Sequence, residues 1–146
     1  MLKYDVHTHV FPPKISAKVL KQLQGHYGIK PVGNGEIDDL LERLNTAALD
    51  RAVVHTAATA PAQVVPANNW SIKLQNKYPQ LLSFGSLHPD YEHIEKELLR
   101  LKHNNIQGLK FHVEFQGFRF DDPAFYALLA HIGAGCILRS LVGDSL

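Results

Sequence analysis

The sequence has one cysteine, no long apolar run and no excess of charge of either sign, and each absence excludes a class of protein. Cys136 has no partner for an internal disulfide, so the chain suits a reducing compartment. A membrane-spanning helix needs about 18 consecutive apolar residues, and no such run occurs. Residues 1–10 also lack the basic and apolar regions of a signal peptide. These features predict a cytoplasmic protein without a membrane partner.

Positive charge is neither abundant nor clustered. The 15 Lys and Arg residues are scattered and balanced by 14 Asp and Glu residues, which gives a formal net charge of +1. Nucleic acids are bound by clustered positive charge, so we expect a small-molecule partner and no nucleic acid. Apolar residues make up 45% and charged residues 20% of the 146 positions, as in ordinary globular domains. We expect a single domain over residues 1–146.

Apolar segments and amphipathic segments alternate along the chain. Strands are expected at 2–7, which should be buried, and at 51–55, 81–87 and 106–114, and a fifth strand can begin within 136–142. Helices are expected at 13–24, 36–47, 61–78, 91–104 and 124–132, with Pro66 either near a helix start or at a kink. Residues 26–35 carry three glycines and a proline, so they should form a loop with His26 and Tyr27 exposed. The alternation predicts an α/β fold with parallel strands and right-handed crossovers.

The most informative segment lies at the end of the first expected strand, where Asp5, His7 and His9 occupy alternate positions before two prolines. Side chains alternate between the faces of a strand, so these three should project to one side. Two neutral imidazoles on a rigid strand end can hold a transition metal, while the carboxylate orients a ligand ring or joins the coordination shell. The prolines end the strand, which places the histidines at a carboxyl end, where α/β proteins have their sites.

Further ionisable residues occur at the later strands. Lys110, His112 and Glu114 alternate with apolar residues, so we expect all three on one face, which would point to a site if the sheet belongs to a barrel. Lys110 can face a substrate or form an ion pair with Glu114. His55 ends the second expected strand, where it can contact substrate or metal or can simply be solvated, and His88 follows the third, where we expect it to contact substrate.

Several segments resemble the amidohydrolase-related family, in the branch that includes aminocarboxymuconate-semialdehyde decarboxylase. The similar segments are Asp5-Val6-His7-Thr8-His9-Val10-Phe11-Pro12, Val54-His55-Thr56, Phe84-Gly85-Ser86-Leu87-His88-Pro89, Gly108-Leu109-Lys110-Phe111-His112, Gln116-Gly117-Phe118 and Asp121-Asp122-Pro123. The resemblance covers about residues 1–133. It implies a TIM-type (β/α)8 barrel that binds one divalent metal, usually zinc, with His7 and His9 as ligands and Asp5 beside them.

The sequence departs from the family pattern in its last part. Such sites are normally completed by a histidine at the fifth strand and an aspartate at the eighth, whereas 135–142 contains no histidine. A complete barrel also takes about 250 residues. The resemblance therefore implies an incomplete, truncated barrel of four to five βα units. Within it, His112 is the best internal candidate for a third ligand or an electrophile, Lys110 can balance substrate charge, and Asp144 can imitate the missing aspartate.

The implied function is that of a metal-dependent hydrolase acting on a small carboxylated, amide or ester substrate. A decarboxylase is an alternative, because both reactions occur on the same scaffold. A non-catalytic half-barrel remnant that binds metal or self-associates is another, supported by the absent histidine. Phosphoesterases of the polymerase-and-histidinol-phosphatase type also begin with His-x-His, but their further motifs are not visible. An unclosed barrel exposes strand edges, so we expect a homo-oligomer through the open edge.

Overall fold

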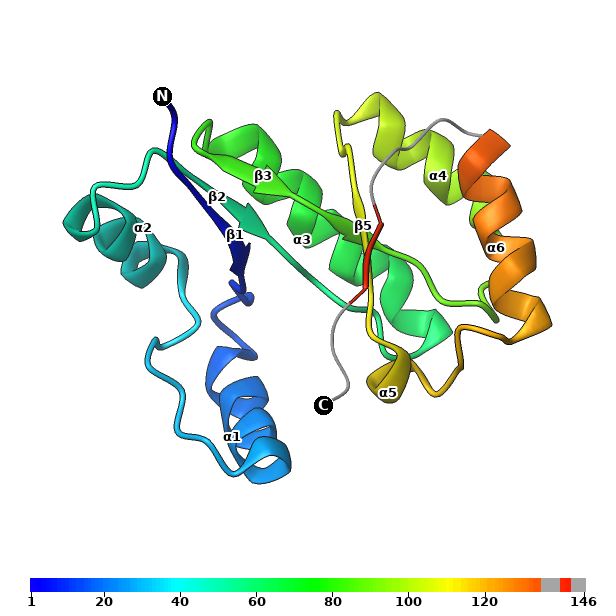
Figure 1. Ribbon diagram of the computed structural model, residues 1–146, viewed down its shortest axis with the longest axis horizontal. Coiled ribbons are helices and arrows are strands. Elements are labelled where there is room, and N and C mark those ends of the chain that lie inside the picture. The colour runs from blue at the N-terminus through cyan, green and yellow to red at the C-terminus, as the bar shows by residue number, and fades with distance from the viewer. Residues whose placement is uncertain (135–139, 143–146) are drawn as a thin grey trace. The chain divides into compact units, whose positions relative to one another are not determined.

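The computed structural model describes residues 1–134 and 140–142, and the chain divides into two compact units, Met1–Val54 and His55–Leu146 (Figure 1). Within the described residues, no helix is both long and apolar enough to cross a bilayer. Both units combine helices with parallel strands, so the expected α/β class is confirmed. The expected residues Cys136 and Asp144 lie outside the described part of the chain.

The first unit contains two strands and two helices. Strand β1 (Tyr4–Thr8) leads to helix α1 (Ser16–Tyr27), then helix α2 (Ile37–Thr46) and strand β2 (Arg51–Val54). The strands pair in parallel with Asp5 opposite Ala52 and Thr8 opposite Val54, so β1 has one residue more than β2 between these pairs. That extra residue is a β-bulge, a feature that re-aims side chains and is frequent beside functional sites.

The second unit contains the remaining elements. They are the 3-10 helix η1 (Pro61–Gln63), α3 (Val64–Lys77), β3 (Leu81–Ser83), β4 (Gly85–Ser86), α4 (Ile94–His103), β5 (Leu109–Phe111), α5 (Val113–Gln116), α6 (Pro123–Ala134) and β6 (Ser140–Val142). Strands β4, β5 and β6 form a parallel sheet in that order, with Ser86 opposite Lys110 and Phe111 opposite Val142. Neighbours in the sequence are thus neighbours in this sheet.

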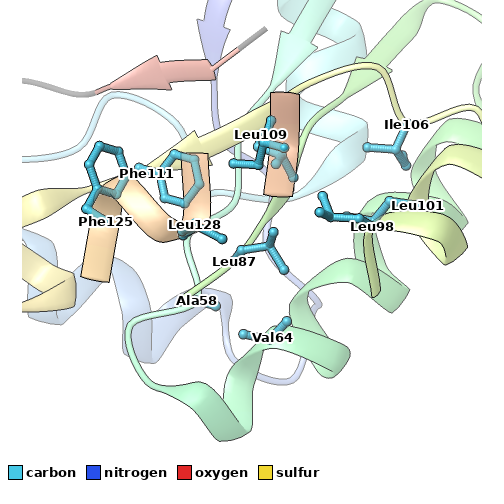
Figure 2. Packing of buried hydrophobic residues seen from close by; sticks show 11 residues of the cluster. Ala58, Val64, Leu87, Leu98, Leu101, Ile106, Leu109, Phe111, Phe125 and Leu128 are labelled. Atoms are coloured by element: carbon cyan, nitrogen blue, oxygen red, sulfur yellow. The ribbon is translucent and has the colours of Figure 1, made fainter. Parts of the chain in front are cut away.

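The core of the second unit is formed by residues of its sheet and of the helices α3, α4 and α6 (Figure 2). Phe111 of β5 packs edge-on against Phe125 of α6, with ring centroids 5.3 Å apart. Asp122 caps α6 by accepting the Ala124 N–H at 3.0 Å, as its position before Pro123 predicts. The buried cluster comprises Ala58, Val64, Leu87, Leu98, Leu101, Ile106, Leu109, Phe111, Phe125, Leu128 and Ile132.

Helix α3 has a buried face that is partly polar. Its buried residues, which follow helical spacing, are Val64, Asn68, Ser71 and Leu74. Two of the four are polar, so a search for apolar residues at helical spacing does not find this face. Asn68 donates to the Ser86 carbonyl at 2.9 Å and accepts the Ser86 N–H at 2.8 Å. The side-chain amide thereby satisfies backbone groups of β4. Pro66 lies in the first turn, where its missing N–H costs nothing, so the helix starts near it without a kink.

The observed bounds of α1 and α2 can be compared with the expected ones. The helix expected at 36–47 is confirmed as α2. The helix expected at 13–24 begins and ends three residues later, because the glycine that ends it is Gly28, with φ +67°, and not Gly25. His26 and Tyr27 are therefore in the last turn of α1 and not in a loop, although they are exposed as expected.

Three strand predictions need correction. The first strand is not buried, since Val6 is 63% exposed. The strand expected at 81–87 is interrupted at Phe84, whose ring lies so close to Gly108 that a Cβ there would come within 2.4 Å of it. The strand expected at 106–114 ends at Phe111, because the Gln116 side chain accepts the His112 N–H at 2.7 Å and α5 begins. Glu114 is consequently an exposed helical residue and does not share a strand face with Lys110.

Candidate functional site

Asp5, His7 and His9 line one open cavity of about 400 Å³ in the first unit. The other walls come from α2 and from the loop between the two helices. The convergence of the three side chains agrees with the alternation expected along the first strand. It occurs in spite of the bulge, which lies between Asp5 and Thr8. Both histidines are exposed, so an ion or ligand can reach them from solvent.

The two imidazoles are spaced as ligands of one ion would be. Their ring centroids are 5.1 Å apart and the ring planes are tilted by 58°. A tetrahedral zinc ion with Zn–N bonds of about 2.0–2.1 Å places two ligating rings about 5 Å apart, centroid to centroid. The donor set and its spacing therefore fit half of a zinc coordination shell. Within residues 1–134 and 140–142, no group of three or more His, Cys, Asp or Glu side chains is arranged to hold a metal.

Asp5 shapes the end of β1 through the backbone. Its Oδ1 accepts the His7 N–H at 3.1 Å, the bond of an Asx turn, in which a carboxylate binds the N–H two residues later. The bulge in β1 and this turn occupy the same residues. Thr8 is buried between the histidines and donates its hydroxyl to the Val53 carbonyl at 2.9 Å. The two bonds fix the backbone from which both imidazoles project.

The loop between α1 and α2 forms a second wall of the cavity. Phe11 donates its N–H to the Gly35 carbonyl at 2.8 Å, and its ring is stacked with that of His9 at 6.3 Å and 5°. Gly35 has φ +72°, and a Cβ at this position would come within 2.9 Å of the Phe11 ring. Only glycine meets both demands. The contact orders the loop next to His9.

An ion pair holds the same loop from α2. Asp39 Oδ2 accepts both the Arg43 Nε–H at 2.9 Å and the Asn34 N–H at 3.2 Å, while Arg43 Nη2 donates to the Val32 carbonyl at 3.1 Å. The hydrogen bond from Arg43 is the main reason why the pKa of Asp39 lies below its usual value. The same bond raises the pKa of Arg43. Both side chains are therefore charged at neutral pH, and both line the cavity.

His55 and His88, the expected substrate residues, belong to the second unit and are buried. The His55 ring packs edge-on against Phe84 at 5.1 Å. His88 Nδ1 accepts the Asp90 N–H at 3.2 Å, so the neutral imidazole carries its proton on Nε2. Its Nδ1 also lies 3.7 Å from the exposed Asp90 carboxylate. Both histidines are therefore shielded from solvent, so neither is a solvated residue at a strand end.

Lys110 and His112 lie at the end of β5. Lys110 is 2% exposed, which is rare for a lysine and means that its stem is packed in the protein. His112 is half-buried and caps the start of α5, with its ring stacked on Phe115 at 4.3 Å. The structure thus places Asp5, His7 and His9 in one unit, and His55, His88, Lys110 and His112 in the other.

Gln116 is a residue whose role sequence reasoning missed. Its Nε2 donates to the carbonyls of Ala58 at 2.8 Å and Leu87 at 2.7 Å, and its Oε1 accepts the His112 N–H at 2.7 Å. The buried amide thus joins the segments that follow His55 and precede His88 to the backbone of His112. The available signal was a polar residue shortly after an apolar strand, directly before a glycine, which has φ +70° in the structure.

No protein-family model matches the chain, and no curated protein is significantly similar to it.

Proposed function

We propose that the chain carries the metal-binding part of an amidohydrolase-type site and acts as a metal-dependent hydrolase on a small carboxylated, amide or ester substrate. The observation that carries the proposal is the pair of imidazoles from one strand end, 5.1 Å apart in a cavity that also contains a carboxylate. That separation matches two ligands of one tetrahedral ion. Zinc is the proposed metal, since imidazole nitrogen is among its preferred donors.

The proposed architecture is an incomplete TIM-type barrel. Its support is the order of the parallel strands, in which β1 lies beside β2, and β4, β5 and β6 lie side by side in chain order. Consecutive parallel strands that are adjacent in a sheet are the pattern of a (β/α)8 barrel. Sites of such barrels lie at the carboxyl ends of the strands, and in this chain Asp5 and His7 lie within β1 while His9 directly follows it.

Each residue of this chain has a distinct part in the proposal. His7 and His9 hold the ion through neutral imidazole nitrogens, and Asp5 keeps the bulge in shape through the His7 N–H. The bound metal supplies an acidified water or a polarised substrate oxygen. The family resemblance also gives His112, Lys110, His55 and His88 parts in such a site, and these four residues lie in the second unit. A decarboxylase would use the same residues.

A second candidate is a half-barrel that binds metal or pairs with another copy without catalysis. One observation favours it: the described residues hold no cluster of three metal-binding side chains. Two imidazoles alone bind zinc weakly compared with a complete set of three or four ligands. The hydrolase and the non-catalytic half-barrel can both bind zinc, but only the hydrolase turns over a substrate.

Metal content is the experiment that tests the site. The purified chain dialysed against zinc should retain about one ion per chain, measured by elemental analysis. The double variant His7→Ala, His9→Ala should lose it. The matched control is His26→Ala, His103→Ala, which removes two exposed helical histidines outside the cavity. Equal zinc in all three proteins would place the metal elsewhere, and no zinc in any of them would reject the site. Hydrolysis of ester and amide panels by the zinc-loaded chain then separates the two candidates.

A further inference from the structure

The cavity that holds the two histidines also contains a guanidinium in a fixed orientation. Arg43 lines the same cavity as His7 and His9. Its Nε donates to Asp39 and its Nη2 donates to the Val32 carbonyl. Arg43 extends from α2, and its two partners belong to α2 and to the loop before it. The side chain is therefore held at two points, which reduces the conformational entropy that it would lose on binding a ligand.

Arg43 keeps donors for a ligand. A guanidinium has five N–H donors, and the two bonds above leave both Nη1 hydrogens and one on Nη2. Within residues 1–134 and 140–142, Nη1 donates no hydrogen bond. The side chain is 49% exposed, so these donors are open to the cavity and to solvent. Two N–H groups on adjacent nitrogens match the two oxygens of a carboxylate.

Arg119 provides a contrast within the same chain. It also pairs with an aspartate, but it uses Nε at 2.8 Å and Nη2 at 3.1 Å on the two oxygens of Asp121. Arg119 thus already makes a bidentate pair with Asp121, and it does not line the cavity. Arg43 instead binds the Asp39 carboxylate through Nε alone, so the edge of the guanidinium formed by Nη1 and Nη2 makes no bidentate pair with a carboxylate.

The charges of the cavity make anion binding depend on the metal. The ionisable lining residues besides the histidines are Asp5, Glu36, Asp39 and Arg43, so the formal charge with neutral histidines is −3 + 1 = −2. A divalent ion would bring this sum to zero. An anionic ligand should therefore bind more tightly after the metal, because the repulsion from the carboxylates is then offset.

We infer that Arg43 is the anchor for the carboxylate of a small monocarboxylic acid with an apolar body, bound in the cavity of His7 and His9. The apolar body is suggested by the remaining wall, which includes Val32, Leu40, Leu44 and Leu49. This inference rests on the proposed function for the role of the bound acid as substrate, but the binding site itself can be tested alone. Benzoate is a suitable probe, and benzamide is its uncharged control.

The first test uses the wild-type chain, so that no variant has to fold. Butanedione modifies accessible guanidinium groups, and peptide mapping by mass spectrometry gives a rate for each arginine. Benzoate should slow the modification of Arg43 several-fold, with no effect on Arg119, and benzamide should protect neither. The protection should appear at lower benzoate concentration when the chain is loaded with zinc. Equal rates at Arg43 with and without benzoate would overturn the inference.

The second test compares variants by titration calorimetry with benzoate. Arg43→Gln should weaken binding at least about 10-fold, since charge-assisted bidentate bonds are lost. Arg43→Lys should weaken it less, and Arg119→Gln should leave it unchanged. Unchanged benzoate affinity in Arg43→Gln would overturn the inference, because the acid would then be held by the metal or elsewhere. Should Arg43→Gln fail to fold, the protection experiment still decides.

The two proposals fail in different ways. Zinc binding without benzoate protection of Arg43 would leave the metal site standing and remove the carboxylate anchor. Protection of Arg43 in a chain that binds no zinc would keep the anchor and remove the proposed metal-dependent function.

Discussion

The two units of the chain place their polar side chains in opposite ways. In the first unit, His7, His9 and Arg43 are exposed around an open cavity. In the second unit, Asn68, Glu97 and other polar groups are buried and bonded to one another. Exposed groups can reach a ligand from solvent without disrupting a buried network, whereas buried groups that bond to one another fix a structure. The comparison assigns ligand binding to the first unit and structural rigidity to the second.

Apolar side chains show the same difference. Among the residues whose exposure the structure describes, most of the exposed large apolar side chains lie in the first unit, and an exposed apolar side chain contributes little hydrophobic stabilisation. They are Met1, Leu2, Tyr4, Val6, Ile15, Tyr27, Ile29 and Val32, against Val65, Leu99, Phe120 and Tyr126 in the second unit. Any ligand that binds only the folded form stabilises it by mass action, whatever the buried apolar surface. Zinc should therefore raise the stability of the first unit.

The second unit owes its rigidity to a buried network as well as to its core. Glu97 is 3% exposed and accepts two bonds from Arg100, at 2.9 and 2.6 Å, and one from Asn68 at 2.7 Å. The bond to Glu97 raises the pKa of Arg100. Ser86 continues the network, donating to the Lys110 carbonyl at 3.1 Å and accepting the Ala58 N–H at 2.9 Å. The network connects α3, α4, β4 and β5.

The largest expected effect tests the core of the second unit. Phe111→Ala removes a fully buried ring that contacts Phe118 and Phe125, so it should lower the free energy of unfolding by about 3–5 kcal/mol. Urea denaturation followed by circular dichroism measures this. Tyr126→Ala, which truncates a 60% exposed ring of α6, should change it by less than about 0.5 kcal/mol. Similar losses in the two variants would contradict the assignment of rigidity to this core.

A smaller effect separates two adjacent asparagines of α3. Asn68→Ala leaves the Ser86 N–H and carbonyl and the Glu97 carboxylate short of a buried partner, which should cost about 2–3 kcal/mol. Asn69→Ala removes one exposed bond to Arg100 and should cost less than about 1 kcal/mol. Thermal unfolding of both variants provides the comparison. If Asn69→Ala cost as much as Asn68→Ala, burial would not be what distinguishes the network.

The sequence predicts the second unit well wherever an element depends on a regular apolar stripe. The helix expected at 124–132 lies within α6, in which Phe125, Leu128 and Ile132 are buried and Leu129 is partly buried. The pattern fails where polar side chains replace strand hydrogen bonds. Asn68 and Gln116 are such residues, and a pattern of hydrophobic residues does not predict polar residues in buried positions. For this reason the expected strand at 106–114 was too long, and the buried face of α3 was not recognised.

The candidate site could be predicted only in part. Asp5, His7 and His9 are adjacent in the sequence, so strand alternation is enough to bring them together at one cavity. Arg43 comes from a different element and is held by the loop before α2, so its position depends on tertiary structure. No local pattern distinguishes it from the other exposed residues of an amphipathic helix. The local sequence thus predicts the candidate metal ligands His7 and His9 more readily than it predicts Arg43, which lies in the same cavity.

The smallest expected effect concerns pH and the loop of the first unit. The pKa of Asp39 is lowered first by the hydrogen bond from Arg43, and its folded value therefore lies below the usual 3.8. A carboxyl group with a depressed folded pKa stabilises the folded form above its unfolded pKa, and this contribution disappears as the pH falls through the folded pKa. The protection of the Asn34 amide against hydrogen exchange should thus be constant from neutral pH to about pH 4 and decrease below it. Nuclear magnetic resonance measures it, after correction for the intrinsic exchange rate.

Two variants sharpen this last comparison. Asp39→Asn should lower the protection of the Asn34 amide at neutral pH and abolish its decrease in acid, because the titrating group and its charge are gone. Asp121→Asn removes the other carboxylate whose pKa is lowered by an arginine, and it should leave the Asn34 amide unaffected. An acid-dependent loss of protection that persists in Asp39→Asn would mean that another carboxylate orders the loop. Arg43 would then lack the fixed orientation on which its affinity for a carboxylate depends.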